Sequence, residues 1–293
     1  MRWPVSSGRN GIGQAWRKLR AGPVSYNDPA MRNTGAAPQN RDAIRLVEVF
    51  SSIQGEGLHV GRRQVFIRTF GCNLRCSYCD SPETLKESGT PAACRVEFPA
   101  GSGQFRSAAN PVGADDLTGF VRSYLVEPHH SISLTGGEPL LHSRFLRRWL
   151  PDVRALGLRI FLETNGLLPD HLASIVDLLD TISMDFKAPS ATGIDIETTR
   201  QRHAAFLEIA RRKEVYAKLV VTAGTTDAEL DMATEALAAA DRSIPLILQP
   251  VTPFGSERSS VSPARLLTLH ARASRRLADV RVIPQTHKLI SLL

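Results

Sequence analysis

Three cysteines lie close together in the stretch GCNLRCSYCD, residues 71–80. Cys72, Cys76 and Cys79 form a C-x3-C-x2-C pattern directly after the apolar run QVFIRTF. On a loop, this spacing lets three sulfur atoms converge, and thiolates are the ligands that suit iron–sulfur clusters and zinc. Three ligands on a four-iron cluster would leave one iron open to a further molecule. This segment is the first candidate for chemistry in the sequence.

A structural zinc site is the alternative for these cysteines, with His59 or Cys94 as the fourth ligand. Structural zinc sites usually combine two paired halves, and this sequence has no second half. Cys94 has no partner motif, so we interpret it as a free thiol. His59, His129, His130 and His142 show no spacing that indicates a metal site or a catalytic pair. The spacing therefore favours an iron–sulfur cluster and leaves zinc open.

The composition is that of an ordinary globular protein, with 42% hydrophobic and 22% charged residues in a chain of 293. No stretch is long and apolar enough to span a bilayer, so we expect no membrane partner. The start, MRWPVSSGRNGIGQAWRKLR, lacks the apolar core of a secretory signal. We therefore expect a cytoplasmic, reducing compartment, where a cysteine cluster binds metal or is redox-active rather than disulfide-bonded.

The net charge of +7 is unevenly distributed. Residues 1–42 hold seven Lys or Arg residues and two acids, Asp28 and Asp42, so their net charge is +5. Only about +2 is left for the rest of the chain. We expect residues 1–42 to be a disordered basic extension, with Met31 as an alternative start. The rest, residues 43–293, would form one core domain. A nearly balanced core does not indicate a nucleic-acid partner.

Apolar runs and stretches of helical periodicity alternate along most of the chain. The runs that predict strands lie at residues 44–50, 64–70, 131–134, 158–162, 181–186, 215–221 and 245–248. Helical periodicity covers residues 114–124, 143–156, 169–179, 199–213, 226–240 and 263–277. This alternation predicts an α/β fold of βα units around a parallel sheet, open or closed into a partial barrel. Residues 87–113 have no such pattern, and we expect an irregular insertion there after the cysteine loop.

Polar segments follow the predicted strands one after another. TFGCN, LTGGEP, LETNG, SMDFK and LQPVTP all lie at or just beyond a strand end. Ligands of parallel sheets bind at the carboxyl ends of the strands. These segments therefore predict one shared active site.

Two of these motifs resemble those of radical S-adenosylmethionine (SAM) enzymes. Cys72, Cys76 and Cys79, with Tyr78 just before the last cysteine, are similar to the superfamily's cluster motif, and TGGEP at residues 135–139 is similar to its second motif. The resemblance implies a partial, open TIM-like βα barrel. It also implies a [4Fe–4S] cluster whose fourth iron binds SAM and cleaves it to a 5′-deoxyadenosyl radical. Gly136 and Gly137 would let the backbone approach the bound methionine closely.

Further segments resemble the 7-carboxy-7-deazaguanine synthase family. These are SSIQGEG at residues 51–57, QVFIR at 64–68, LQPVTP at 248–253 and VIPQTHKL at 282–289. The resemblance covers residues 44 to 293 apart from the insertion. It implies conversion of 6-carboxy-5,6,7,8-tetrahydropterin to 7-carboxy-7-deazaguanine with loss of ammonia, a step toward queuosine.

The family resemblance also implies a role for individual residues. The pterin would be bound by Ile53, Gln54, Gly55, Arg68 and Thr135, with the Arg68 guanidinium on the substrate carboxylate. SAM would be bound by Tyr78, Cys79, Asp80, Gly137, Ser183, Asp185, Lys187 and Gln249. Ser81 would bind Mg²⁺ at a position where the family often has threonine. Arg68 could instead be a salt-bridge partner, and Asp185 with Lys187 a structural ion pair.

The resemblance implies partners as well. A flavodoxin or ferredoxin would supply the electron, and the chain would form a homodimer. Two other functions remain open: a radical SAM activase of a glycyl-radical protein, and a non-enzymatic, metal-stabilised RNA-binding module. The activase would not be expected to carry SSIQGEG and PQTHKL, and the module would not explain the polar segments at successive strand ends.

Overall fold

The computed structural model describes residues 42–85, 91–254 and 257–292. A ten-stranded sheet with the order β12-β11-β10-β9-β8-β7-β3-β2-β4-β5 forms its centre. The pairs β3–β7, β7–β8, β8–β9, β9–β10, β10–β11 and β11–β12 are all parallel, which confirms the predicted βα architecture. The sheet has two free edges, β12 and β5, so the barrel is open. The predicted basic extension lies outside the described residues, except for Asp42.

The strands and helices follow the predicted order with shifts of a few residues. The strands are β1 Ala43–Ile44, β2 Leu46–Ile53, β3 Arg63–Thr69, β4 Ala93–Glu97, β5 Phe105–Ala109, β6 Val112–Gly113, β7 Ser131–Gly136, β8 Arg159–Thr164, β9 Thr181–Asp185, β10 Glu214–Val221, β11 Leu246–Pro250 and β12 Val280–Val282. The α-helices are α2 Ala114–Tyr124, α3 Ser143–Arg154, α4 Pro169–Ala173, α5 Pro189–Thr192, α6 Ile196–Ala210, α7 Asp227–Ala240, α8 Pro263–Ala273 and α9 Thr286–Leu289. No helix in these ranges is long and apolar enough to cross a membrane.

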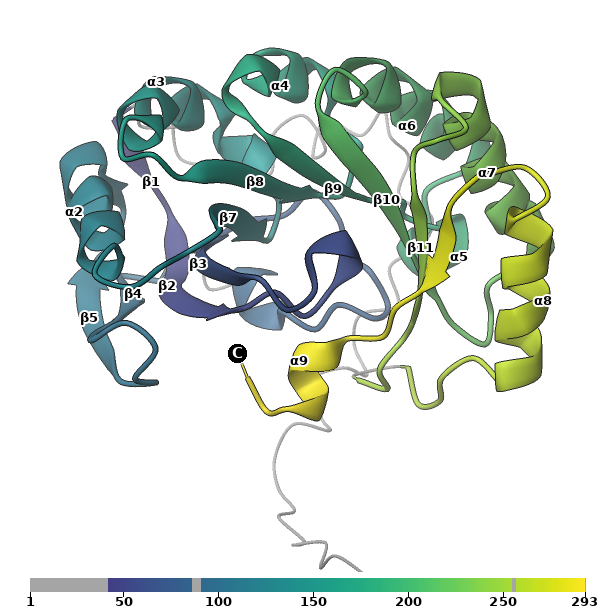
Figure 1. Ribbon diagram of the computed structural model, residues 1–293, viewed down its shortest axis with the longest axis horizontal. Helices are drawn as coiled ribbons and strands as arrows, with labels where there is room; N and C mark the ends of the chain where they lie inside the picture. The colour runs from purple at the N-terminus through teal and green to yellow at the C-terminus, as the bar shows by residue number, and fades with distance from the viewer. Residues whose placement is uncertain (1–41, 86–90, 255–256, 293) are drawn as a thin grey trace, which may run out of the picture.

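Several helices cover one face of the curved sheet. Figure 1 shows α3, α4, α6, α7 and α8 along its outer side, with α9 on the inner side. Local sequence signals start several of these helices; Thr226 and Glu229, for example, form a complete capping box at α7. The predicted helix at 169–179 is interrupted: α4 ends at Ala173 and a 3₁₀ turn follows at Val176–Leu178.

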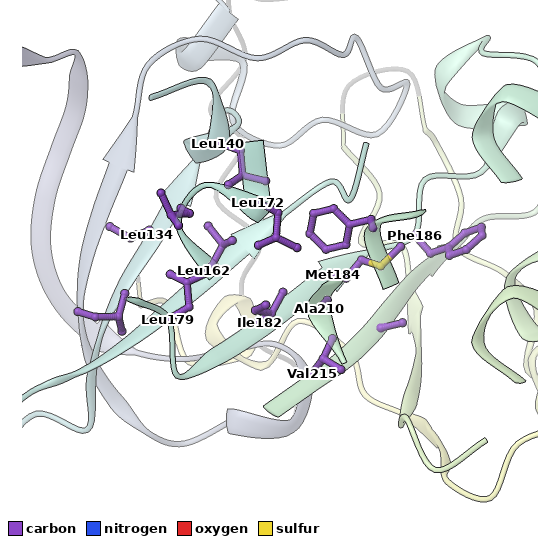
Figure 2. Close-up of a cluster of buried hydrophobic side chains, with 14 of the residues drawn as sticks. Leu134, Leu140, Leu162, Leu172, Leu179, Ile182, Met184, Phe186, Ala210 and Val215 are labelled. Carbon is purple, nitrogen blue, oxygen red and sulfur yellow. The ribbon is translucent and has the colours of Figure 1, made fainter. Parts of the chain in front are cut away.

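Alternation along each strand gives the sheet two different faces. On β8, Ile160 and Leu162 pack into the main core under the helices, whereas Glu163 points to the inner face. On β9, Ile182 and Met184 do the same, and Figure 2 shows them packed with leucines from neighbouring strands and helices. The helices therefore bury one side of every central strand, and the other side is free to carry polar groups.

A small apolar cluster closes one end of the inner face. Phe161, Tyr216 and Ile247 pack together with the half-buried Leu58 and Ile283. Each of the three strand residues comes two positions before a polar residue that lines the active-site cavity: Glu163, Lys218 and Gln249. The inner face is thus apolar toward the amino ends of the strands and polar toward their carboxyl ends.

Our prediction of an irregular insertion at residues 87–113 was wrong for the described part. β4 and β5 form an antiparallel hairpin, and β4 pairs with β2 at the edge of the sheet. β6 pairs with β1. These strands escaped detection because an edge hairpin with charged, exposed side chains, such as Arg95 and Arg106, lacks a clean apolar alternation. β12 was missed because it has only three residues.

Candidate active site

One cavity of about 560 Å³ opens at the carboxyl ends of the parallel strands. Its walls come from the cysteine loop after β3 and from the ends of β7, β8, β9, β10 and β11. Every site residue expected from the sequence lines it: Ile53, Gln54, Gly55, Arg68, Cys72, Cys76, Tyr78, Cys79, Asp80, Ser81, Thr135, Gly137, Ser183, Asp185, Lys187 and Gln249. The fold therefore brings the whole predicted set together.

The three cysteines of the loop share this cavity as free thiols. Cys72 and Cys76 pack against Leu74, whose backbone N–H lies 3.4 Å from the Cys72 sulfur. Burial raises the pKa of Cys72 to about 12 and that of Cys76 to about 11, and it also raises the pKa of Cys79. The thiols are therefore protonated without metal, and metal binding must release protons. Within the described ranges, no three His, Cys, Asp or Glu side chains are grouped as a metal site.

The glycines of TGGEP allow two loops to touch backbone to backbone. A Cβ on Gly137 would lie 2.0 Å from the carbonyl oxygen of Gly71, at the start of the cysteine loop. The Glu138 N–H donates to the same carbonyl at 2.8 Å, and the Gly137 N–H donates to the Thr69 carbonyl at 3.1 Å. We expected Gly136 and Gly137 to make room for a bound methionine. In the structure, the missing Cβ of Gly137 makes room for the cysteine loop.

Glu138 joins the end of β7 to the end of β8. Its fully buried carboxylate accepts hydrogen bonds from Leu140 N at 3.0 Å, Thr164 Oγ1 at 2.8 Å and Asn165 N at 2.8 Å. Burial raises its pKa to about 7 in spite of these donors. Asn165 in turn donates to Asn73 Oδ1 at 2.8 Å, inside the cysteine loop. This chain of contacts fixes the loop against two strand ends.

Glu163 forms hydrogen bonds with two of the predicted pterin residues, Gln54 and Thr135. Glu163 accepts hydrogen bonds from Gln54 Nε2 at 2.9 Å, Ser133 Oγ at 3.0 Å and Thr135 Oγ1 at 3.2 Å. Gln54 also donates to Gln64 at 3.0 Å. Glu163 was missing from our expected set, although its position in LETNG at a strand end was a signal for it.

A buried row of alternating charges crosses the ends of β9 and β10. Lys218 pairs with Glu56 and lies 3.8 Å from Asp185, which pairs with Lys187 at 2.7 Å. Burial alone would lower the pKa of Lys218, but Coulombic attraction to Glu56 and Asp185 outweighs it and raises the pKa. Asp185 and Lys187 therefore form an ion pair, which was the alternative that we gave to a role in SAM binding. Both residues nevertheless line the cavity. Sequence analysis missed Lys218 and Glu56.

The C-terminal segment covers one side of the cavity. Thr286 donates from its N–H to the Gly55 carbonyl at 2.9 Å, and Gln285 donates to Glu56 at 2.7 Å. Gln285 also reaches Asp80 at 3.0 Å, where Lys288 pairs at 2.8 Å. Burial alone would raise the pKa of Asp80, but Lys288 and Gln285 lower it to about 2. The segment therefore ties residues 55–56 to the end of the cysteine loop.

Comparisons with known proteins identify the family. Residues 66–237, more than half of the chain, match the Radical SAM superfamily. The 7-carboxy-7-deazaguanine synthase of Geobacter sulfurreducens is 44% identical over 258 residues, which cover 87% of this chain and 100% of that protein. The chain belongs to this family. The synthase of Methanothermobacter thermautotrophicus is 37% identical over 84% of this chain and 97% of its own.

A solved structure shares the fold of this synthase-family chain. The crystal structure of QueE from Escherichia coli superimposes with a TM-score of 0.53 and 20% identity, over 84% of this chain and 95% of that one. The expected open radical SAM barrel is confirmed. As a radical SAM family member, the chain has SAM and a [4Fe–4S] cluster as its cofactors.

The cavity of this family member offers polar atoms that fit a ligand such as SAM. Among the described residues, Tyr78 Oη, Asp185 Oδ1 and Gln249 Oε1 are buried without a hydrogen-bond partner, and all three side chains line the cavity. Buried polar groups normally have partners. SAM carries hydroxyl, amino and carboxylate groups that can supply them, and the three thiols are a suitable donor set for iron. The residues present thus fit both groups.

Arg68, near the end of β3, also lines the cavity of this synthase-family chain. Its Nε donates to Glu48 at 2.9 Å, and its Nη1 donates to Ser81 Oγ at 3.2 Å. The salt-bridge alternative for Arg68 therefore also holds, since Glu48 is its partner. Arg95, from the β4–β5 hairpin, pairs with the second oxygen of Glu48. Sequence analysis missed both Glu48 and Arg95.

Proposed function

We propose that this chain converts 6-carboxy-5,6,7,8-tetrahydropterin to 7-carboxy-7-deazaguanine with release of ammonia, as a radical SAM carbon–nitrogen lyase of queuosine precursor synthesis. One observation carries the proposal above the others. The cysteine loop, the TGGEP turn and the SSIQGEG segment face a single cavity in a chain that matches a named synthase over that protein's full length.

The cofactor side of the cavity would be formed by the cysteine loop and β9. Cys72, Cys76 and Cys79 would hold the cluster, and the cluster with bound SAM would supply a 5′-deoxyadenosyl radical. The polar groups of SAM would contact Tyr78, Asp80, Gly137, Ser183, Asp185, Lys187 and Gln249, together with the backbone of Cys79. The unpartnered Asp185 Oδ1 and Gln249 Oε1 would accept hydrogen bonds from it.

The substrate side would be formed by the end of β2, the segment that follows it and the end of β7. Ile53, Gln54 and Gly55 would contact the pterin ring, with Thr135 beside them. Glu163 holds the Gln54 amide and the Thr135 hydroxyl in place before substrate arrives. Arg68 would bind the substrate carboxylate, because its guanidinium is fixed by Glu48 and Ser81 at the cavity wall. Prior fixation of these groups lowers the entropic cost of orienting the substrate.

Mg²⁺ would bind at Ser81, in the wall of the cavity. The Ser81 hydroxyl lies 3.5 Å from Asp80 Oδ1, so a second oxygen ligand is close. A single hydroxyl with waters and substrate oxygens suits Mg²⁺, which keeps much of its hydration shell. We further propose a flavodoxin or ferredoxin as electron donor, a homodimer as the assembly and the cytoplasm as the location.

The two other functions are not favoured. An activase of a glycyl-radical protein or a metal-stabilised RNA-binding module would not account for synthase relatives matched over 97% to 100% of their length. Structural zinc is likewise not favoured, because neither of the two candidate fourth ligands, His59 and Cys94, is among the residues that line the cavity with the other three cysteines.

An anaerobic assay tests the function. The reconstituted chain is mixed with SAM, a reductant, Mg²⁺ and 6-carboxytetrahydropterin, and products are read by mass spectrometry. Appearance of 7-carboxy-7-deazaguanine supports the proposal. Formation of 5′-deoxyadenosine with the pterin unchanged would reject the substrate, and no SAM cleavage by protein shown to carry four irons would reject the radical chemistry.

A further inference from the structure

Arg95 brings the edge hairpin into the wall of the active-site cavity. It lies on β4, and its guanidinium pairs with Glu48 Oε2 through Nη2. The guanidinium also stacks on Phe105 of β5, 4.3 Å from the ring centroid. Arg95 and Glu48 line both the main cavity and a smaller one of about 270 Å³ beside it. The hairpin is therefore part of the site as well as the edge of the sheet.

Glu48 lies between two guanidinium groups that are held in the same manner. Its Oε1 accepts from Arg68 Nε at 2.9 Å, and Arg68 lies over Phe50 with 5.6 Å to the centroid. Glu48 as a residue is only 5% exposed. One buried carboxylate cannot balance two guanidiniums, so this group of three keeps one positive charge at the cavity wall.

Both arginines retain donors for a ligand. In the described part of the chain, Arg95 donates only through Nη2, and Arg68 donates through Nε and Nη1. Asp80 and Glu83 are among the other acids that line the main cavity; Asp80 is paired with Lys288, and Glu83 also lines the smaller cavity. Paired guanidiniums with free N–H groups suit a planar carboxylate, which accepts several hydrogen bonds at once.

We propose that Arg95 is a second binding residue for the carboxylate of the pterin substrate, beside Arg68, and so a determinant of specificity for a 6-carboxylated ring. The inference rests on the proposed function, because it concerns the same substrate. It assigns a binding role to the hairpin.

A binding measurement on the cluster-loaded full chain tests this role. The dissociation constant is measured anaerobically, with SAM and without reductant, for 6-carboxytetrahydropterin and for the same ring without the carboxylate. Arg95→Gln should bind the carboxylated pterin about ten-fold more weakly, the loss expected for one charge-assisted hydrogen bond at a partly exposed site, and should bind the other ring as wild type does. Arg95→Lys should lose less, because it keeps the charge.

Arg106→Gln is the matched control. Arg106 stacks on Phe98 at 4.1 Å in the same hairpin but does not line the cavity, so both dissociation constants should stay at the wild-type values. Unchanged binding of the carboxylated pterin by Arg95→Gln would overturn the inference. Equal weakening for both ligands would overturn it too, since it would indicate a general disturbance of the cavity. If the wild-type protein does not bind the carboxylated pterin at all, that result would instead reject the proposed function.

Discussion

Lys218 and Glu56 form an ion pair in the wall of the cavity, although 162 positions separate them in the chain. Both side chains are largely buried, at 7% and 17% exposure. Lys218 also faces Asp185, and Glu56 also accepts from Gln285. The pair thus connects β10 and β9 with the SSIQGEG segment and the C-terminal segment.

Replacing Lys218 should destabilise the protein strongly. Lys218→Met leaves Glu56 and Asp185 buried without their shared cation, at a cost of about 3 kcal/mol in the free energy of unfolding. Urea unfolding of the metal-free protein under anaerobic conditions measures this cost. The double variant Glu56→Gln/Lys218→Met should recover part of it, because it removes one unpaired charge. A double variant as unstable as the sum of both single variants would contradict coupling between the two residues.

Glu138 should make stability depend on pH. Its pKa of about 7 in the folded chain is above the ordinary 4.5, so the folded chain holds this proton more tightly than the unfolded chain does. The stabilisation is complete below pH 4.5 and is lost as the pH rises through about 7. The change should amount to about 3 kcal/mol.

Comparison with Glu138→Gln isolates this effect. The amide does not titrate, so the difference in unfolding free energy between wild type and variant should change between pH 4.5 and pH 7. Urea unfolding at several pH values measures it. A difference that stays constant over this range would show that Glu138 titrates normally.

Gly137 should not tolerate a side chain. In Gly137→Ala the new Cβ would meet the Gly71 carbonyl at 2.0 Å, so the TGGEP turn and the cysteine loop must separate. We expect iron content after reconstitution to fall below half of the wild-type value. Gly119→Ala is the control, because Gly119 lies within α2 with nothing near its Cβ position. That variant should keep its iron and gain up to about 1 kcal/mol of stability.

Replacing Cys76 and replacing Cys94 should have different effects on the iron content of the protein. Cys76→Ala should prevent retention of a four-iron cluster, measured as iron and acid-labile sulfide per chain. Cys94→Ala should retain the cluster, since Cys94 is buried on β4 and is not among the residues that line the cavity. A single zinc ion in the wild-type protein, lost on replacement of Cys94, would support the structural zinc site instead.

Replacing Ser81 should change the Mg²⁺ concentration that turnover requires more than it changes the rate of SAM cleavage. In Ser81→Ala the proposed hydroxyl ligand is lost, so the Mg²⁺ concentration for half-maximal turnover should rise about ten-fold or more. Ser81→Thr keeps the hydroxyl and should stay near wild type. Mg²⁺ titration of product formation, with 5′-deoxyadenosine followed in parallel, measures both. An unchanged Mg²⁺ dependence in Ser81→Ala would remove this residue from the metal site.

The sequence by itself determined the features of this protein that depend on residues close together in the chain. The spacing of Cys72, Cys76 and Cys79, the alternating strands and the polar segments at their ends were all readable, because a strand shows its two faces with a period of two. In a parallel sheet, those ends must meet at one edge. The predicted site residues therefore line one cavity in the structure.

Only the tertiary structure decided which distant groups meet. Lys218 stands in the apolar run VYAKLVV, and nothing near it in sequence indicates that Glu56 is its partner. The Gly137 contact with Gly71 depends on how two loops cross, and Arg95 reaches Glu48 only because a charged edge hairpin pairs with β2. Such contacts depend on long-range packing and strand pairing, so local propensity and periodicity do not predict them.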